Sequence, residues 1–186
     1  MAEFVSFSPN VEVRGEVVEA FIAGFPAGTR EIGLECLMKF DIRDPRPGAW
    51  YPLQPFLAAM KELKERLGAP FLTRIGEQIA SKAVLPPGID SLEACLSSID
   101  TAYHMNHRGG EIGHYHYTYQ GTQRGLHRAV MACSNPYPCS FDLGVIQGFA
   151  RRFKPASAID VIVIHEEGGA CRKKGDLSCN YLISWT

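Results

Sequence analysis

Hydrophobic residues recur every three or four positions through most of the first hundred residues. The clearest case is the stretch 53–67, which Gly68 ends. Its apolar face consists of Phe56, Leu57, Met60, Leu63 and Leu67. The same spacing predicts helices over 14–24, 30–40, 70–83 and 91–104, with Thr29 and Ser91 as caps. Proline and glycine between them predict loops, and weak alternation over 2–13 predicts a short strand.

The pattern changes to a period of two near residue 111. In 111–121, three tyrosines (115, 117 and 119) fall on one face, and His114, His116 and Thr118 fall on the other. The stretch 125–133 also alternates, so the two segments are expected to pair as a hairpin. A helix over 139–153 and strands over 158–166 and 180–185 follow.

This order of elements predicts an α+β fold. The helical N-terminal half, 1–108, would pack on a C-terminal antiparallel sheet within 109–186, with a long helix between two strand pairs. At 186 residues without an evident linker, the chain is expected to be a single domain, 1–186.

Composition narrows the classes of partner. The net charge is -1, so neither nucleic acid nor an anionic membrane is expected as a partner. The sequence predicts no signal peptide and no transmembrane helix, which favours a cytoplasmic location. In a reducing compartment, six cysteines are expected to be thiols or metal ligands, with Cys36 and Cys95 in the core.

Chemistry-bearing residues gather in the last third of the chain. Cys139 opens the helix, where the helix dipole favours a thiolate, and Cys171 and Cys179 flank a glycine-containing loop. Zinc prefers four tetrahedral ligands from Cys, His and carboxylate. A fourth ligand could come from the strand end, at His165, Glu166 or Glu167. The spacing alone also fits a few thiols with no metal.

This segment resembles the 4-vinyl-reductase, or hydrocarbon-binding, domain family. The family signature is a cysteine at a helix start, a glycine-containing helix, a strand with an acidic end and two cysteines before a final strand. Here it reads CSFDLGVIQGFARRF, VIVIHEE, CRKKGDLSC and NYLISW. In the family's phenol sensors these positions hold a structural zinc, which implies Cys139, Cys171 and Cys179 as ligands. Gly168 stands where the family has its acidic ligand, so His165, Glu166 and Glu167 compete for the fourth place.

The resemblance also implies a ligand pocket. Relatives share the fold of nitric-oxide sensors and Golgi transport subunits, and they hold a hydrophobic ligand between helices and sheet. Aromatic residues suit such a lining. The residues expected to contribute are Trp50, Phe56, Tyr103, His114 and His116. For any one of the aromatic residues, packing in a solid core is the default alternative, and the histidines could face solvent. A tetrapyrrole is an alternative ligand that no motif in the sequence supports.

The sequence therefore predicts a small-molecule sensor domain more than an enzyme. Two alternatives stand beside it, an enzyme or carrier acting on tetrapyrrole intermediates and an adaptor subunit. No nicotinamide or flavin fingerprint, phosphate loop or nucleophile elbow occurs in the sequence. Relatives often pair, so a homodimer is expected, and any output would pass through a downstream protein that the sequence does not identify.

Overall fold

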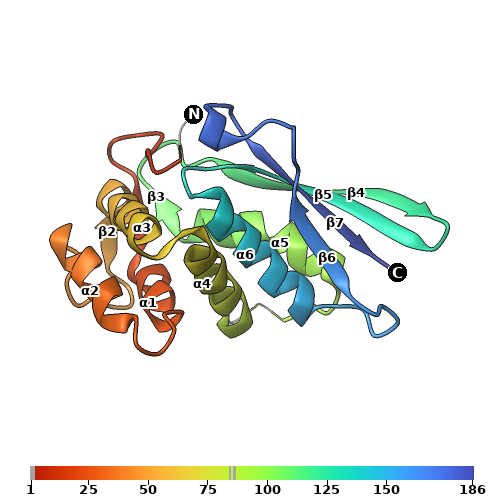
Figure 1. Ribbon diagram of the computed structural model, residues 1–186, viewed down its shortest axis with the longest axis horizontal. Helices are drawn as coiled ribbons and strands as arrows, with labels where there is room; N and C mark the ends of the chain where they lie inside the picture. The colour runs from red at the N-terminus through yellow and green to blue at the C-terminus, as the bar shows by residue number, and fades with distance from the viewer. Residues whose placement is uncertain (1–2, 84, 86) are drawn as a thin grey trace.

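The computed structural model describes residues 3–83, 85 and 87–186. A helical half and a twisted antiparallel sheet pack against each other, which confirms the α+β fold (Figure 1). The helices are α1 (Gly15–Ala23), α2 (Arg30–Lys39), α3 (Leu53–Leu67), α4 (Ala69–Lys82), α5 (Leu92–Met105), α6 (Cys139–Arg152) and the 3₁₀ turn η1 (Arg172–Lys174). The strands are β1 (Glu12–Arg14), β2 (Trp50–Pro52), β3 (His107–Arg108), β4 (His114–Gln123), β5 (Leu126–Ser134), β6 (Val161–His165) and β7 (Cys179–Trp185). No described helix is both long and apolar enough to cross a membrane.

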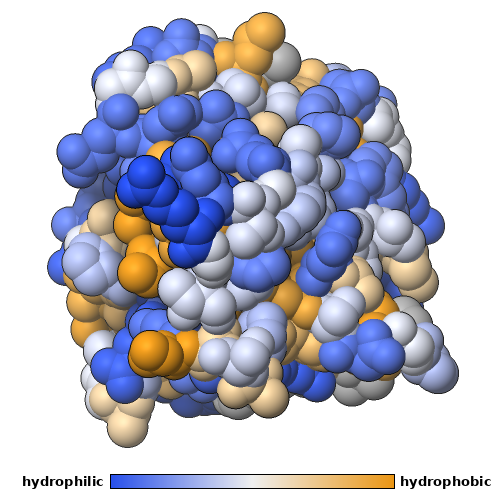
Figure 2. Space-filling view, turned by 90° about the vertical axis from the view of Figure 1, so that its right-hand side faces the viewer, coloured by the Kyte–Doolittle hydropathy of each residue, from blue (hydrophilic) through white to orange (hydrophobic). Residues whose placement is uncertain are grey.

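The larger sheet has the strand order β4-β5-β7-β6, and every neighbouring pair is antiparallel. Arg124 and Gly125, both with positive φ, form the two-residue turn of the β4–β5 hairpin. Helices α5 and α6 cover one face of this sheet (Figure 1). The end of the molecule at the right of Figure 1 is mostly hydrophilic, with small separate hydrophobic groups (Figure 2). Burial alternates along β6 and β7, which shows that one face of the sheet is covered, and a ligand pocket can form on that face.

A second, smaller sheet was not predicted. It joins β2, β1 and β3 in that order. Of the expected strand 2–13, only 12–13 belongs to a strand, β1, and the expected loop 41–52 ends in strand β2. Strands of two or three residues have no room for a period-two pattern, and only their tertiary partners define them. The expected cap at Thr29 is also absent, because its hydroxyl donates to the carbonyl of Pro26 at 2.8 Å.

Helices α4 and α6 lie unusually close together, because glycine stands where they cross. A Cβ atom on Gly144 would lie 1.9 Å from the carbonyl oxygen of Thr73 in α4. A Cβ atom on Gly76 would lie 2.5 Å from the carbonyl oxygen of Phe141 in α6. Each helix thus needs a position without a side chain, and this close contact fixes where α6 begins relative to α4.

We expect Gly144→Ala to destabilise the fold, because the added methyl group would collide with backbone and not with a movable side chain. The overpacking cost is about 1–3 kcal/mol, which outweighs the higher helix propensity of alanine. Urea unfolding followed by circular dichroism measures it. The exposed helical substitution Thr101→Ala serves as the control and should change stability by less than about 0.5 kcal/mol. Equal stability of the two variants would contradict the close helix contact.

Candidate metal centre and ligand pocket

Three thiols and one imidazole meet at the N-terminal end of α6. Cys139 opens α6, Cys171 and Cys179 bracket the turn η1, and His165 ends β6. The four ligand atoms lie within 4.8 Å of one another. The sulfur of Cys139 is 3.1 Å from that of Cys179 and 3.8 Å from that of Cys171, and Cys171 and Cys179 are also 3.8 Å apart. The start of α6 and the segment 165–179 therefore bring four potential ligand atoms to one point.

These distances fit a tetrahedral metal better than a disulfide. A disulfide needs about 2.0 Å between sulfurs. Around zinc, with Zn–S bonds of about 2.3 Å, tetrahedral geometry places sulfurs about 3.8 Å apart. The Nε2 atom of His165 is buried and finds no hydrogen-bond partner among the described residues. The donor set, Cys₃His, is one that structural zinc sites use.

Surrounding groups prepare one thiol to ionise. The backbone N–H and the Nε–H of Arg172 donate to the sulfur of Cys179 at 3.3 and 3.5 Å. Hydrogen bonding from Cys139, and then from Arg172, lowers the pKa of Cys179 to about 4. The same pairing raises the pKa of Cys139, and burial adds to the rise. The cluster thus favours one thiolate at Cys179 even before a metal binds.

The two acidic candidates at the strand end are placed differently. The carboxylate of Glu166 accepts a hydrogen bond from the side-chain amide of Asn180 at 2.9 Å, and Glu166 is not one of the four residues of the cluster. Glu167 is exposed and is not part of the group either. His165 is therefore the strand-end residue that the structure brings to the three cysteines. A surface cleft of about 690 Å³, lined in part by Cys139 and His165, gives access to the cluster.

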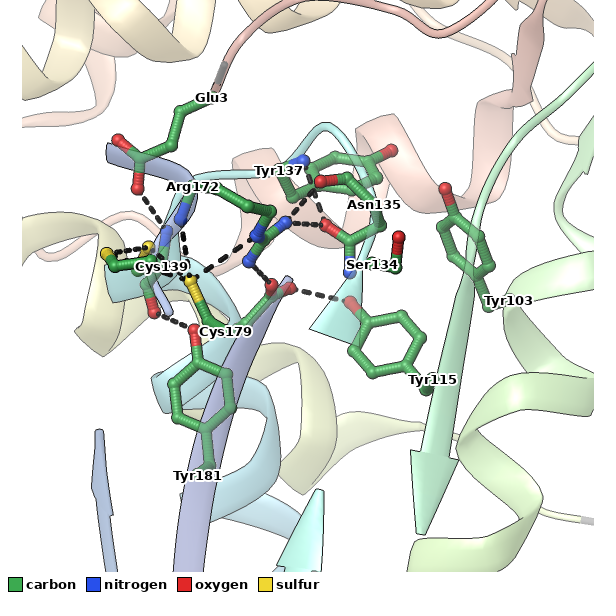
Figure 3. A network of polar contacts seen from close by, with 12 residues as sticks. Glu3, Tyr103, Tyr115, Ser134, Asn135, Tyr137, Cys139, Arg172, Cys179 and Tyr181 are labelled. Carbon is green, nitrogen blue, oxygen red and sulfur yellow. Dashed lines mark hydrogen bonds and ion pairs between the residues drawn. The ribbon is translucent and has the colours of Figure 1, made fainter. Parts of the chain in front are cut away.

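A buried ion pair lies directly behind the cluster. The guanidinium of Arg172 contacts the carboxylate of Asp142 in α6, and both side chains are fully buried. Arg172 also donates to the backbone and side-chain oxygens of Asn135 (Figure 3). The hydroxyl of Tyr115 donates to Asp142 at 2.6 Å. Burial raises the pKa of Asp142, which Arg172 opposes, and the carboxylate raises the pKa of Arg172 against the effect of burial.

An apolar cavity of about 520 Å³ lies on the other side of this ion pair, between the helices and β4. Its size falls in the usual range for small-molecule pockets. Aliphatic and aromatic side chains from α1, α4, α5 and α6 supply most of the wall, among them Val17, Ala20, Ile79, Ile99, Phe141 and Val145. Four buried polar residues complete it, namely Tyr103, His107, Tyr115 and Tyr137. Tyr115 touches both the cavity and Asp142, so the cavity and the cluster share one network.

Of the five residues expected to bind a ligand, the structure brings only Tyr103 into this wall. Trp50 lies in the small sheet, where the guanidinium of Arg108 is 4.2 Å from its ring centre. Phe56 packs in the core against Phe21, with ring centres 5.1 Å apart. His114 and His116 are exposed, because the alternation of β4 turns Tyr115 inward and the histidines outward.

Asp142, Arg172 and Tyr137 were not singled out from the sequence. Asp142 carries a usable signal, since it stands at i of an apolar i, i+3, i+4, i+7 stripe completed by Val145, Ile146 and Phe149. A carboxylate on a buried helix face requires a buried partner. The sequence does not reveal which cation pairs with this carboxylate, because Arg172 is one of three basic residues in its loop.

Solved structures with a similar fold are H-NOX domains. One is an oxygen-binding H-NOX domain related to soluble guanylate cyclases, in its oxygen complex, with a TM-score of 0.59, 14% identity and coverage of 93% of this chain and 94% of that chain. Another structure, whose description concerns the function of heme distortion in the H-NOX family, has a TM-score of 0.60, 14% identity and coverage of 93% of this chain and 94% of that chain. A third, described by heme redox potential and porphyrin distortion, has a TM-score of 0.59, 13% identity and coverage of 93% and 99%.

At this identity the likeness establishes the fold. The link to the fold of nitric-oxide sensors is thereby confirmed. No protein-family model and no curated protein matches the chain. Function must therefore be argued from the residues of the site.

We expect Asp142→Asn to be among the most damaging single substitutions. It leaves Arg172 buried without its counter-charge, which costs about 3–5 kcal/mol. Asp44→Asn is the matched control, because Asp44 pairs with Arg46 on the surface at 3.0 Å with 79% and 77% of the two side chains exposed. Such pairs contribute about 0–1 kcal/mol. Denaturant unfolding of both variants measures the difference, and similar losses would show that the buried pair is not critical.

Proposed function

We propose that this chain is a small-molecule-binding sensor domain in which a structural zinc ion holds the ligand pocket in shape. The observation that carries the proposal is the apolar cavity of about 520 Å³ in an H-NOX-like fold. Its volume lies in the range of small-molecule pockets, and its mostly apolar wall with a few polar groups is the composition that such pockets have.

The zinc proposal rests on the donor set. Cys139, Cys171, Cys179 and His165 supply four ligand atoms, and the resemblance to the 4-vinyl-reductase family independently points to the three cysteines. A site filled by four protein ligands leaves no open position for a water molecule, so the ion would be structural. It would join the start of α6, the end of β6 and the start of β7.

The link between the two sites supports a sensor. Arg172 lies between the ligand residues Cys171 and Cys179 and reaches Asp142, and Asp142 holds the pocket residue Tyr115. An ordered loop around the metal is therefore needed to keep one wall of the cavity in place. A ligand that orders this wall can alter the stability of the loop at the surface by the same contacts.

We expect one zinc ion per chain in protein purified without chelator. Cys179→Ser should lose the metal and destabilise the fold by several kcal/mol, because metal binding contributes to the free energy of folding. His165→Gln should weaken zinc binding, whereas Glu166→Gln should not. Cys133→Ser is the control, since Cys133 is buried opposite Cys179 in the sheet but outside the group of four. Elemental analysis below about 0.2 zinc per chain, with no other metal, would sink the idea.

We expect the cavity to bind an apolar probe. Pyrene should bind with a rise in melting temperature, because a ligand bound to the folded state stabilises it by mass action. Ala20→Trp, from the cavity wall, should fill the space and abolish the effect, whereas Ala23→Trp at the exposed end of the same helix should retain it. Fluorescence titration and thermal unfolding measure both. If neither pyrene nor a wider set of apolar compounds shifts the thermal unfolding transition, the sensor function is contradicted and the adaptor alternative is favoured.

A further inference from the structure

The hydrogens of the four buried polar residues in the cavity wall can be assigned from their partners. The Nδ1 atom of His107 lies 2.8 Å from the carbonyl oxygen of Tyr103, which can only accept, so Nδ1 carries the hydrogen. Burial lowers the pKa of His107 to about 4, so the ring is neutral and its Nε2 atom is bare. The hydroxyl of Tyr137, 2.7 Å away, therefore donates to Nε2.

The other two phenols are also committed as donors. Tyr103 donates its hydroxyl hydrogen to the carbonyl of Ile112, and Tyr115 donates to the carboxylate of Asp142 at 2.6 Å. Burial raises the pKa of all three tyrosines, so they remain protonated. Each phenolic oxygen retains lone pairs but has no second hydrogen. The buried polar part of the wall thus offers hydrogen-bond acceptors only.

The charged residues around the cavity also disfavour an anionic ligand. Among the described residues that line it there is no Lys or Arg. Glu16 stands at the half-exposed rim, where its own backbone N–H is the main cause of a lowered pKa, and Arg14 pairs with it at 2.7 Å. Asn106, also at the rim, donates one amide hydrogen to the carbonyl of Ala102, so at most one amide hydrogen is left for a ligand. A single neutral amide does not compensate an anion that leaves water.

We propose, building on the ligand-binding function above, that the cavity selects uncharged, predominantly apolar molecules that carry a hydroxyl or N–H donor, and rejects carboxylates. The donor would bond to a phenolic oxygen whose own hydrogen is already engaged. The rest of the molecule would fill the aliphatic and aromatic wall.

Heme does not fit this wall. Heme carries two carboxylates, for which the lining offers no cation, and its iron takes a protein ligand such as a histidine nitrogen. The one histidine among the described lining residues, His107, has both ring nitrogens in hydrogen bonds within the protein. The chain thus shares a fold with domains whose descriptions name heme, while its cavity has a different chemistry.

Three probes with one ring system separate these properties, namely pyrene, 1-pyrenemethanol and pyrene-1-carboxylate. Each is titrated against the full chain by its own fluorescence. We expect 1-pyrenemethanol to bind about tenfold more tightly than pyrene, as one hydrogen bond would give. We expect the carboxylate to bind at least about tenfold more weakly than pyrene, because its charge would be desolvated without a partner. Heme, followed by its absorption band, should not bind stoichiometrically.

Ala20→Trp and Ala23→Trp assign the signals to this cavity, since only the first should abolish binding. Equal or tighter binding of the carboxylate, stoichiometric binding of heme, or no preference for the alcohol over pyrene would overturn the selectivity while leaving the sensor function intact. If no probe binds at all, the proposed function itself fails and the selectivity falls with it.

Discussion

The contact between Arg172 and Asp142 is the constraint on which the rest of the site depends. Both side chains are fully buried, so each charge has lost its hydration and relies on the other. The pair joins the loop before the last strand to the first turn of α6. From there, Arg172 reaches the sulfur of Cys179 and the oxygens of Asn135. A hydrophobic pair of the same size would fill the space but would not orient the thiol loop by hydrogen bonds.

Helix α6 presents both candidate sites. Its first residue, Cys139, belongs to the thiol cluster, and Phe141, Val145 and Phe149 from the same helix line the cavity. The glycine contacts with α4 set the position of this helix, because backbone meets backbone there. The hydroxyl of Tyr181 also donates to the carbonyl of Cys139 at 2.9 Å. A movement of this helix would therefore move the thiol cluster and the cavity wall together.

The likeness to H-NOX domains concerns the chain path and not the chemistry of the pocket. One fold can present different side chains at the same cavity, and the side chains decide what binds. Here the buried polar part of the wall consists of three phenols and one neutral imidazole, and the hydrogens of all four are engaged. A sensor of this kind would read the apolar shape and one donor group of its ligand. Its readout would pass through the loop that Arg172 holds.

Much of the architecture follows from the sequence because it is encoded locally. The helix 53–67 appears with the predicted bounds, and the hairpin, α6 and the final strands lie where the periodicity places them. Cys139, Cys171 and Cys179 could be selected as one cluster from their positions at element ends and from the family resemblance. The alternation of β4 also fixed that Tyr115 and His116 face opposite sides.

Only the tertiary structure shows which residues from different segments contact one another. The three short strands exist only through mutual pairing, and His165 joins the cysteines because β6 ends beside η1, which no spacing rule reveals. Likewise, Trp50 and Phe56 read as equally good pocket residues as Tyr103, since an aromatic side chain has the same pattern in a core and in a cavity wall. The position of Asp142 on an apolar helix face indicates that it has a buried cationic partner. That this partner is Arg172 and not one of the neighbouring lysines depends on how the last loop folds back.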